Sequence, residues 1–257
     1  MDLHLSSKKV LITGGTRGIG YACAEIFLQE GATVSIVGSS SSSVANACSN
    51  LFKTYGSKTE GIVLDLTYRN DQLLLAQYLE DIDILVNNAG AIPGGGFESL
   101  NDEQWRQAWD LKVYGYIDAT RQALEKMSQR GQGVILNVIG IAGVTPRYDY
   151  LCGSAGNAAL INFTQAVGAE STRYGVRVLG VNPGPTETDR VKSLYMARAR
   201  QRLGDESRWK ELLSDLPFKR PAKPEEIAEI IVFMASEKSS YLSGVVLDID
   251  GGARFSS

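Results

Sequence analysis

Seven short apolar runs, separated by longer segments with helical spacing, constrain the fold of this chain more than any other feature. Each run is rich in β-branched residues and ends in glycine or polar residues; the runs are residues 10–12, 34–37, 62–64, 84–86, 134–138, 176–181 and 245–249. Continuous apolar runs of this length are typical of strands buried on both faces of a sheet. Because strand and helix alternate, with right-handed crossovers, the pattern predicts an α/β fold whose parallel sheet is covered by helices on both sides.

The sequence indicates one domain, residues 1–257, a length that suits a single α/β sheet. The serine run 39–43 is too short to separate domains and falls at a predicted strand-to-helix turn. The formal charge of −3 argues against nucleic acid as a partner, because binding to phosphates needs a basic surface. There is no long apolar run and residues 1–10 lack a signal-peptide core, so we expect a cytoplasmic protein without membrane contact.

Few residues of the chain are suited to holding a metal. Cys23, Cys48 and Cys152 cannot all pair and match no metal or disulfide framework, and His4 is the single histidine. We therefore expect neither a metal site nor catalysis by a serine–histidine–aspartate triad.

A glycine-rich turn follows the first predicted strand. Residues 13–20 read Thr-Gly-Gly-Thr-Arg-Gly-Ile-Gly and lead into a predicted helix. Glycines let the backbone approach a pyrophosphate closely, and the N-terminus of the next helix offers free N–H groups and positive potential. Two alternatives remain open for this turn alone, a dinucleotide site or a tight strand–helix connection, because the spacing differs from the ordinary G-x-G-x-x-G pattern.

Further motifs follow later strands in the same order as in a known family. Asn-Asn-Ala-Gly at 87–90, Asn-Pro-Gly at 182–184 and Asp-Gly-Gly at 250–252 join T-G-x-x-x-G-x-G at 13–20. Together with residues 221–252, these motifs strongly resemble the short-chain dehydrogenase/reductase family, and the resemblance covers nearly the whole chain. It implies a doubly wound, seven-stranded Rossmann sheet, a nicotinamide cofactor and, usually, a homotetramer.

The resemblance and the local chemistry together assign a set of cofactor-binding residues. By resemblance, Asp65 would meet the adenine, Asn88 the adenosine ribose side, and Thr188 the carboxamide of nicotinamide. The full expected set is Thr13, Gly14, Thr16, Arg17, Gly18, Ile19, Gly20, Ser39, Ser40, Asp65, Leu66, Asn88, Ala89, Gly90, Pro183, Gly184 and Thr188.

The end of the second strand favours NADP(H) over NAD(H). A site for NAD places an acidic side chain there, on the ribose hydroxyls, but no Asp or Glu occurs between residues 31 and 59. Arg17 can reach a 2′-phosphate with its guanidinium, and Ser39 and Ser40 can donate hydrogen bonds to it. The alternative is that Arg17 is solvated and the serines only cap the next helix.

The catalytic residues of the family are replaced in this chain. The family uses a tyrosine to protonate the carbonyl oxygen and a lysine four residues later, with a serine thirteen residues before the tyrosine and an asparagine on the preceding helix. Alignment places Gly140 at the serine, Gly153 at the tyrosine, Asn157 at the lysine and Lys112 at the asparagine. We expect slow ordinary carbonyl reduction. If only the acid is missing, restoring tyrosine at 153 and serine at 140 in a chain with Lys112→Asn and Asn157→Lys is expected to speed it.

Four residues are candidates for the missing chemistry. Lys112 and Asn157 look like an exchange, in which the Lys112 ammonium fills the family lysine's place; the alternative is an ordinary helix-surface lysine. Tyr148 or Tyr150 could supply a phenol in the space left by the two glycines; the alternative is that both are packing residues. Cys152 has no histidine to act as its base.

The segment 186–217 is expected to cover a small-molecule substrate. Its cations could receive an anionic group, or could form a solvated face paired with nearby acids. The cations are Arg190, Lys192, Arg198, Arg200 and Arg202, and the acids are Asp205, Glu206 and Glu211.

Three functional hypotheses remain at this point. The first is an NADP(H)-dependent oxidoreductase acting on a small carbonyl or alcohol with atypical catalytic groups. The others are a non-redox lyase or isomerase on the same scaffold, and a cofactor-binding protein without turnover. We also expect a homotetramer or homodimer built partly on the helix 153–174, whose small residues allow close approach to a two-fold mate.

Overall fold

The computed structural model describes residues 2–56 and 59–255, with only the backbone of residues 190 and 201. Its centre is a seven-stranded sheet with the order β3-β2-β1-β4-β5-β6-β7, parallel throughout. All seven predicted strands are confirmed. They are β1 Lys9–Thr13, β2 Thr33–Gly38, β3 Glu60–Val63, β4 Ile84–Asn87, β5 Gly133–Val138, β6 Val176–Pro183 and β7 Val246–Ile249.

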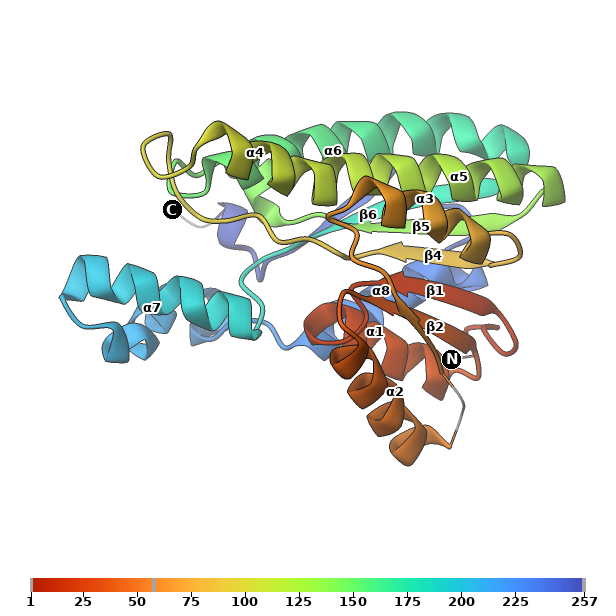
Figure 1. Ribbon diagram of the computed structural model, residues 1–257, viewed down its shortest axis with the longest axis horizontal. Coiled ribbons are helices and arrows are strands. Elements are labelled where there is room, and N and C mark those ends of the chain that lie inside the picture. The colour runs from red at the N-terminus through yellow and green to blue at the C-terminus, as the bar shows by residue number, and fades with distance from the viewer. Residues whose placement is uncertain (1, 57–58, 256–257) are drawn as a thin grey trace.

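Helices cover both faces of this sheet (Figure 1). On one face lie α1 Gly18–Gln29, α2 Ser41–Tyr55 and α8 Pro224–Ala235. On the other lie α3 Arg69–Leu74, α4 Asp102–Trp109, α5 Gly115–Arg130 and α6 Leu151–Ser171. The predicted three-layer, doubly wound α/β fold is therefore confirmed.

Burial differs between the central and the outer strands. The strands β1 and β4 are almost wholly buried, as their continuous apolar runs predict. The prediction of burial on both faces is wrong for β3 and β7, which form the two edges of the sheet and leave several side chains exposed. An edge strand has a neighbour on one side only, so the helices cover it incompletely.

The chain reverses its direction across the sheet between β1 and β4. Strands β1, β2 and β3 extend the sheet one way from this point, and β4 to β7 extend it the other way. In such sheets the carboxyl ends of the strands at the reversal border a crevice in which ligands bind. The glycine-rich turn after β1 and the Asn-Asn-Ala-Gly segment after β4 meet there.

The segment expected to cover the substrate forms a helical hairpin. It consists of α7 Asp189–Leu203 and the 3₁₀ helix η5 Glu206–Asp215, and it projects from the body of the protein (Figure 1). Among the described residues no helix combines the length and the apolar character needed to span a membrane.

Candidate active site

The turn after β1, residues 13–20, is called here the glycine turn. Gly14 and Gly18 have φ of +65° and +58°, values that side-chain-bearing residues rarely adopt. A Cβ on Gly20 would lie 2.5 Å from the amide nitrogen of Asn88 and still closer to the carbonyl of Gly14. The glycines are therefore required by conformation and by packing, and they bring the backbone to the opening of the crevice.

The N-terminus of α1 faces this turn without a competing anion. Arg17 occupies the N-cap without a side-chain cap, and no acidic residue lies in the first turn. The first N–H groups of such a helix attract a phosphate. The Arg17 side chain is exposed at the same end, where a guanidinium can contact a phosphate from the solvent side.

The serines after β2 form the cap of α2. Ser40 is the N-cap residue, and its hydroxyl accepts a hydrogen bond from the backbone N–H of Ser43 at 3.3 Å. Ser39 and Ser40 are both exposed. Ser40 therefore caps α2, and its exposed hydroxyl can still reach a ligand from solvent.

Asn88 fastens the end of β4 to the glycine turn. Its amide nitrogen donates to the carbonyls of Thr13 and Gly14 at 3.2 and 3.0 Å, while the Thr13 hydroxyl accepts from the backbone N–H groups of Asn88 and Ala89. The amide nitrogen of Asn88 thus shapes the turn itself. The expected contact of Asn88 with a ribose stays a prediction.

Two more of the expected cofactor residues lie at the rim of the crevice. Thr188 caps α7, and its methyl group would lie 3.1 Å from a Cβ on Gly18, so the start of α7 sits against the glycine turn. The carboxylate of Asp65 accepts from the N–H and the hydroxyl of Thr67 at 3.1 and 2.7 Å. These bonds fix the carboxylate after β3.

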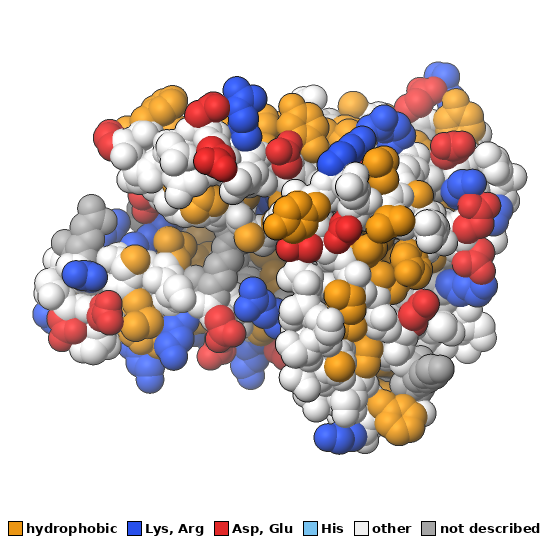
Figure 2. All heavy atoms as spheres, in the orientation of Figure 1, with side chains coloured by type: hydrophobic (Ala, Val, Ile, Leu, Met, Phe, Trp, Pro, Cys, Tyr) orange, Lys and Arg blue, Asp and Glu red, His pale blue; other side chains and the backbone are white. Residues whose placement is uncertain are grey.

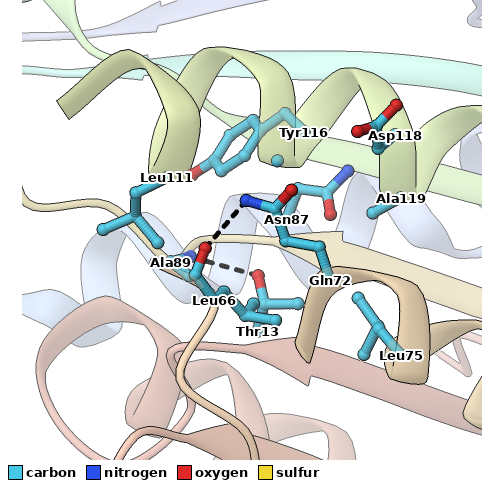
Figure 3. Close-up of a pocket in the computed structure, with 11 residues that line it drawn as sticks. Thr13, Leu66, Gln72, Leu75, Asn87, Ala89, Leu111, Tyr116, Asp118 and Ala119 are labelled. Atoms are coloured by element: carbon cyan, nitrogen blue, oxygen red, sulfur yellow. Dashed lines mark hydrogen bonds between the residues drawn. The ribbon is translucent and has the colours of Figure 1, made fainter. Parts of the chain in front are cut away.

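Figure 3 shows a small cavity behind the crevice, between β4 and the helices above it. Its volume is about 10 Å³, the space of one water molecule. Gln72 donates to the carbonyl of Leu66 at 2.9 Å across one side of it. The cavity is too small for a substrate, so a substrate has to bind outside it.

Lys112 lies in a single π-helical turn, η2 Asp110–Tyr114, that joins α4 to α5. The side chain is buried, with 6% exposed, and its ammonium donates to the carbonyl of Ile139 at 2.6 Å. Its stem passes Gly90, where a Cβ would lie 3.0 Å from Cδ of Lys112. The interpretation of Lys112 as an ordinary surface lysine is therefore wrong, because the π turn directs this side chain inward.

Asn157 donates a hydrogen bond to the backbone carbonyl of Gly140, which follows the carbonyl of Ile139 that Lys112 binds. Its amide nitrogen donates to the carbonyl of Gly140 at 3.3 Å, and the residue is 2% exposed. Gly140 has φ of +132°, and a Cβ there would lie 2.9 Å from the amide nitrogen of Asn157. Lys112 and Asn157 are thus brought together around two consecutive carbonyls after β5, Ile139 and Gly140.

The ring of Tyr150 fills the space above Gly153. A Cβ added to Gly153 would clash with the edge of the ring, 2.7 Å from Cδ1 and closer still to Cε1 and Cζ. Gly95 bridges to the backbone beside this tyrosine: its N–H donates to the carbonyl of Asp149 at 2.8 Å, and its carbonyl accepts from the N–H of Leu151 at 3.2 Å. The ring of Tyr150 therefore takes the space in which a side chain at residue 153 would begin.

The loop that holds Tyr150 in place was not identified from the sequence. Its signal is the run of three glycines at 94–96 after Pro93. Gly95 has φ of +134°, and Gly96 gives room to the ring of Tyr148. Consecutive glycines before an aromatic residue point to close backbone approach.

Tyr148 points away from Gly153. Its side chain is 58% exposed, and its hydroxyl donates to the carboxylate of Glu98 at 2.7 Å. This hydrogen bond to Glu98, with a smaller effect of partial desolvation, raises the pKa of Tyr148. Tyr148 therefore does not supply a phenol in the space at Gly153.

The cations of α7 do not form one uniform face. Lys192, Arg200 and Arg202 are exposed, and Figure 2 shows basic and acidic side chains close together over this hairpin. Arg198 differs: its side chain is 13% exposed and pairs with Asp149 at 3.0 Å. The solvated-face interpretation is therefore wrong for Arg198. The side chain of Arg190 lies outside the described residues.

A larger cavity, of about 250 Å³, lies beyond the carboxyl ends of β6 and β7. It borders Gly184, one of the expected cofactor residues, and is walled mainly by apolar side chains. The apolar wall is formed by Pro185, Leu216, Pro217, Phe218 and Ile249. The cavity is thus large and apolar enough to hold a small apolar group.

The described residues contain no cluster of three or more potential metal ligands. Cys152 is buried, and burial raises the pKa of its thiol. A thiol with a raised pKa carries little thiolate and is a poor nucleophile.

Comparison with known proteins agrees with this geometry. A model of the short chain dehydrogenase family matches residues 8–199. An uncharacterized oxidoreductase of Thermotoga maritima is 33% identical over 256 residues, which is 98% of this chain and 99% of the relative.

Two solved structures share the whole fold. L-sorbose reductase of Gluconobacter frateurii, complexed with NADPH and L-sorbose, is 29% identical with a TM-score of 0.91, and the match covers 100% of both chains. A variant of actinorhodin polyketide ketoreductase with NADPH is 26% identical with a TM-score of 0.91, covering 97% of this chain and 98% of the other. This chain therefore belongs to the short-chain dehydrogenase family of oxidoreductases.

Proposed function

We propose that this protein is an NADP(H)-dependent oxidoreductase that interconverts a small carbonyl compound and its alcohol, with Tyr150 as proton donor. The observation that carries the proposal is the ring of Tyr150 in the space above Gly153. A phenol at this place supplies the proton that a side chain at residue 153 does not supply.

The proposed binding of NADP(H) is supported by how well the residues of the crevice suit this cofactor. The glycine turn and the uncapped N-terminus of α1 leave room and positive potential for a pyrophosphate. Arg17, Ser39 and Ser40 would hold the 2′-phosphate, and the absence of acidic residues in the described part of 31–59 favours that phosphate. Two similar structures are NADPH complexes. Bound NADPH supplies a hydride for the carbonyl carbon.

The residues of this chain would act as follows. The hydroxyl of Tyr150 donates a hydrogen bond to the carbonyl oxygen and gives it a proton during reduction, becoming a phenolate. The buried Lys112 ammonium places a positive charge at the end of β5, and a nearby positive charge stabilises a phenolate. In the alcohol-oxidising direction the same phenolate accepts the proton.

The substrate would bind under the helical hairpin. The pair between Arg198 and Asp149 joins α7 to the loop that carries Tyr150, which supports the expectation that residues 186–217 cover the substrate. The exposed cations of α7 favour an anionic substrate.

Assembly is a further part of the proposal. Ala155, Ala158, Ala159 and Ala166 are exposed on α6, and Phe163 beside them is half-buried. This small-residue face supports an isologous contact between two copies, as in a homodimer or homotetramer.

Substitution of the two loop tyrosines tests the function. Tyr150→Phe is expected to lower kcat for carbonyl reduction by about 10²- to 10⁴-fold, the usual contribution of a general acid, with NADPH affinity kept within about twofold. Tyr148→Phe is the matched control and is expected to keep kcat. Turnover with NADPH across a panel of aldehydes, ketones and oxoacids is the measurement. NADPH binding without turnover of any member would favour the cofactor-binding protein, and an unchanged kcat of Tyr150→Phe would exclude Tyr150 as the acid.

A further inference from the structure

The turn before α6 is closed by a hydroxyl of the helix itself. Ser154 is 4% exposed, and its hydroxyl accepts a hydrogen bond from the backbone N–H of Arg147 at 3.0 Å and donates one to the carbonyl of the same residue at 3.3 Å. That carbonyl also accepts from the N–H of Tyr150 at 3.2 Å. Both backbone groups of Arg147, the first residue of the turn 147–150, are therefore bound by one buried side chain of α6.

Tyr150, the last residue of this turn, is held from the other side by Gly95. Tyr150 is the N-cap residue of α6, but it makes no side-chain cap hydrogen bond. The N–H of Leu151, at the start of the helix, donates instead to the carbonyl of Gly95 at 3.2 Å, and the N–H of Gly95 donates to the carbonyl of Asp149 at 2.8 Å. The first N–H groups of a helix need such partners from outside it. Gly95 thus fixes both neighbours of Tyr150, while Ser154 fixes the start of its turn.

The direction of the Tyr150 ring follows from these attachments. The ring lies over Gly153, where a Cβ would be 2.7 Å from its Cδ1. Ser154 is the next residue of the helix, so the hydroxyl that binds the turn and the glycine that accommodates the ring are adjacent on α6. The backbone that bears a side chain sets its direction. An acid acts only when its hydroxyl lies within hydrogen-bond reach of the atom that it protonates.

We infer that Ser154 is a positioning residue, which sets the direction of the Tyr150 phenol through the turn 147–150; this inference rests on the proposed function. The Ser154 hydroxyl transfers no proton to the substrate. Its loss releases the start of the turn from α6 and lets the phenol shift away from the carbonyl oxygen. A shift of about 1 Å can lower a rate by about 10²-fold.

Ser154→Ala removes both hydrogen bonds and places a good helix former in α6. With NADPH and a carbonyl compound that the wild type reduces, it is expected to lower kcat about 10- to 100-fold. The KM for NADPH is expected to change less than about twofold, because the acid does not hold the cofactor. If Ser154→Ala fails to fold, Ser154→Cys, which keeps the volume and weakens both hydrogen bonds, is measured in its place.

Ser171→Ala, at the other end of α6, is the matched control. Ser171 is 1% exposed, and its hydroxyl donates to the carbonyl of Val176 at 2.9 Å. Both alanine variants remove a buried hydroxyl from the same helix, so both are expected to lower Tm by roughly 2–6 °C. Only Ser154→Ala is expected to lower kcat. A kcat of Ser154→Ala no lower than that of Ser171→Ala would overturn the inference.

A double-mutant cycle shows whether Ser154 acts through Tyr150. In a Tyr150→Phe background, Ser154→Ala is expected to lower kcat by less than about a further twofold, because the phenol that it positions is already gone. Its effect on Tm is expected to stay the same. An equal fold-loss of kcat in both backgrounds would show a merely structural role and overturn the inference alone. If Tyr150→Phe itself keeps the kcat of the wild type, the proposed acid is wrong and the inference falls with it.

Discussion

The ring of Tyr150 and a side chain at residue 153 cannot occupy this site together. A Cβ on Gly153 would clash with the edge of the ring, and the ring is held by a loop that bridges to Gly95. Tyr150 and Gly153 are therefore one unit: the glycine provides the space, and the tyrosine of the preceding loop fills it. A substitution at residue 150 therefore changes the effect of a substitution at residue 153, and the reverse also holds.

Gly153→Ala should destabilise the protein by about 1–3 kcal/mol, the typical cost of forcing an extra methyl into a packed site. In a Tyr150→Ala background the same change should cost much less, because the ring is gone. Urea unfolding of the wild type, both single variants and the double variant measures this coupling. Equal costs of Gly153→Ala in both backgrounds would show that the ring moves freely.

The same clash corrects an expectation from the sequence. Restoring tyrosine at Gly153 and serine at Gly140 was expected to raise carbonyl reduction. Gly153 has no room for a side chain while Tyr150 is present, and Gly140 has φ of +132°. The restored pair is therefore expected to misfold or to stay inactive unless Tyr150 is replaced as well.

Lys112→Met should lower the free energy of unfolding by about 1–3 kcal/mol, because the stem stays but the carbonyl of Ile139 loses its donor in a buried place. This differs from the alternative of a helix-surface lysine, whose replacement changes stability little. The exposed Lys53, on α2, provides the control Lys53→Met, which should change stability by less than about 0.5 kcal/mol. A loss no larger than that of the control would show that the ammonium is not needed for the fold.

NADP(H) should bind at least about tenfold tighter than NAD(H), which is about 1.4 kcal/mol. Arg17→Ala should remove most of this preference by weakening NADPH and leaving NADH unchanged, because only NADPH carries the 2′-phosphate. Both affinities are measured by calorimetry, with Arg173→Ala, an exposed arginine paired with Glu170 on α6, as control. Equal affinities of the wild type for the two cofactors would contradict the preference.

Glu226 should make stability depend on pH in the acid range. Hydrogen bonds from Arg220 and from the N–H of Lys223 lower the pKa of its carboxyl from 4.5 to about 2. A depressed pKa in the folded state adds stability that is complete above pH 4.5 and disappears as the pH falls towards 2. Glu226→Gln should therefore lower Tm at pH 7, and the difference from wild type should shrink between these two pH values.

The control for this measurement is Glu225→Gln, which removes the neighbouring first-turn charge of α8. A difference between Glu226→Gln and wild type that stays constant from neutral pH to pH 2 would contradict the assigned pairing.

The sheet could be predicted from the sequence because apolar runs and turns are local signals. The strands at 10–12 and 84–86 and the glycine turn between β1 and α1 are all found where expected. The exposed sides of β3 and β7 were missed because a strand's place in the sheet order depends on the whole fold.

The candidate active site could be predicted only in part. The replacement of four family positions was visible in the sequence, but the choice between Tyr148 and Tyr150 depends on which ring lies over Gly153. Likewise, the direction of Lys112 depends on a π-helical turn that no residue pattern marked. Both the choice of tyrosine and the burial of Lys112 depend on the direction in which a side chain points. One extra residue in a turn of the backbone can reverse that direction.

The ion pair between Arg198 and Asp149 couples movement of the α7 hairpin to movement of the loop that carries Tyr150. An opening of the α7 hairpin must either break this pair or pull on the residue next to Tyr150. In the first case the ion pair slows the entry of a ligand, and salt weakens this effect. In the second case the phenol of Tyr150 leaves its position above Gly153 whenever the hairpin opens. If Tyr150 is the acid, as we propose, the second case would confine proton transfer to the closed state of the hairpin.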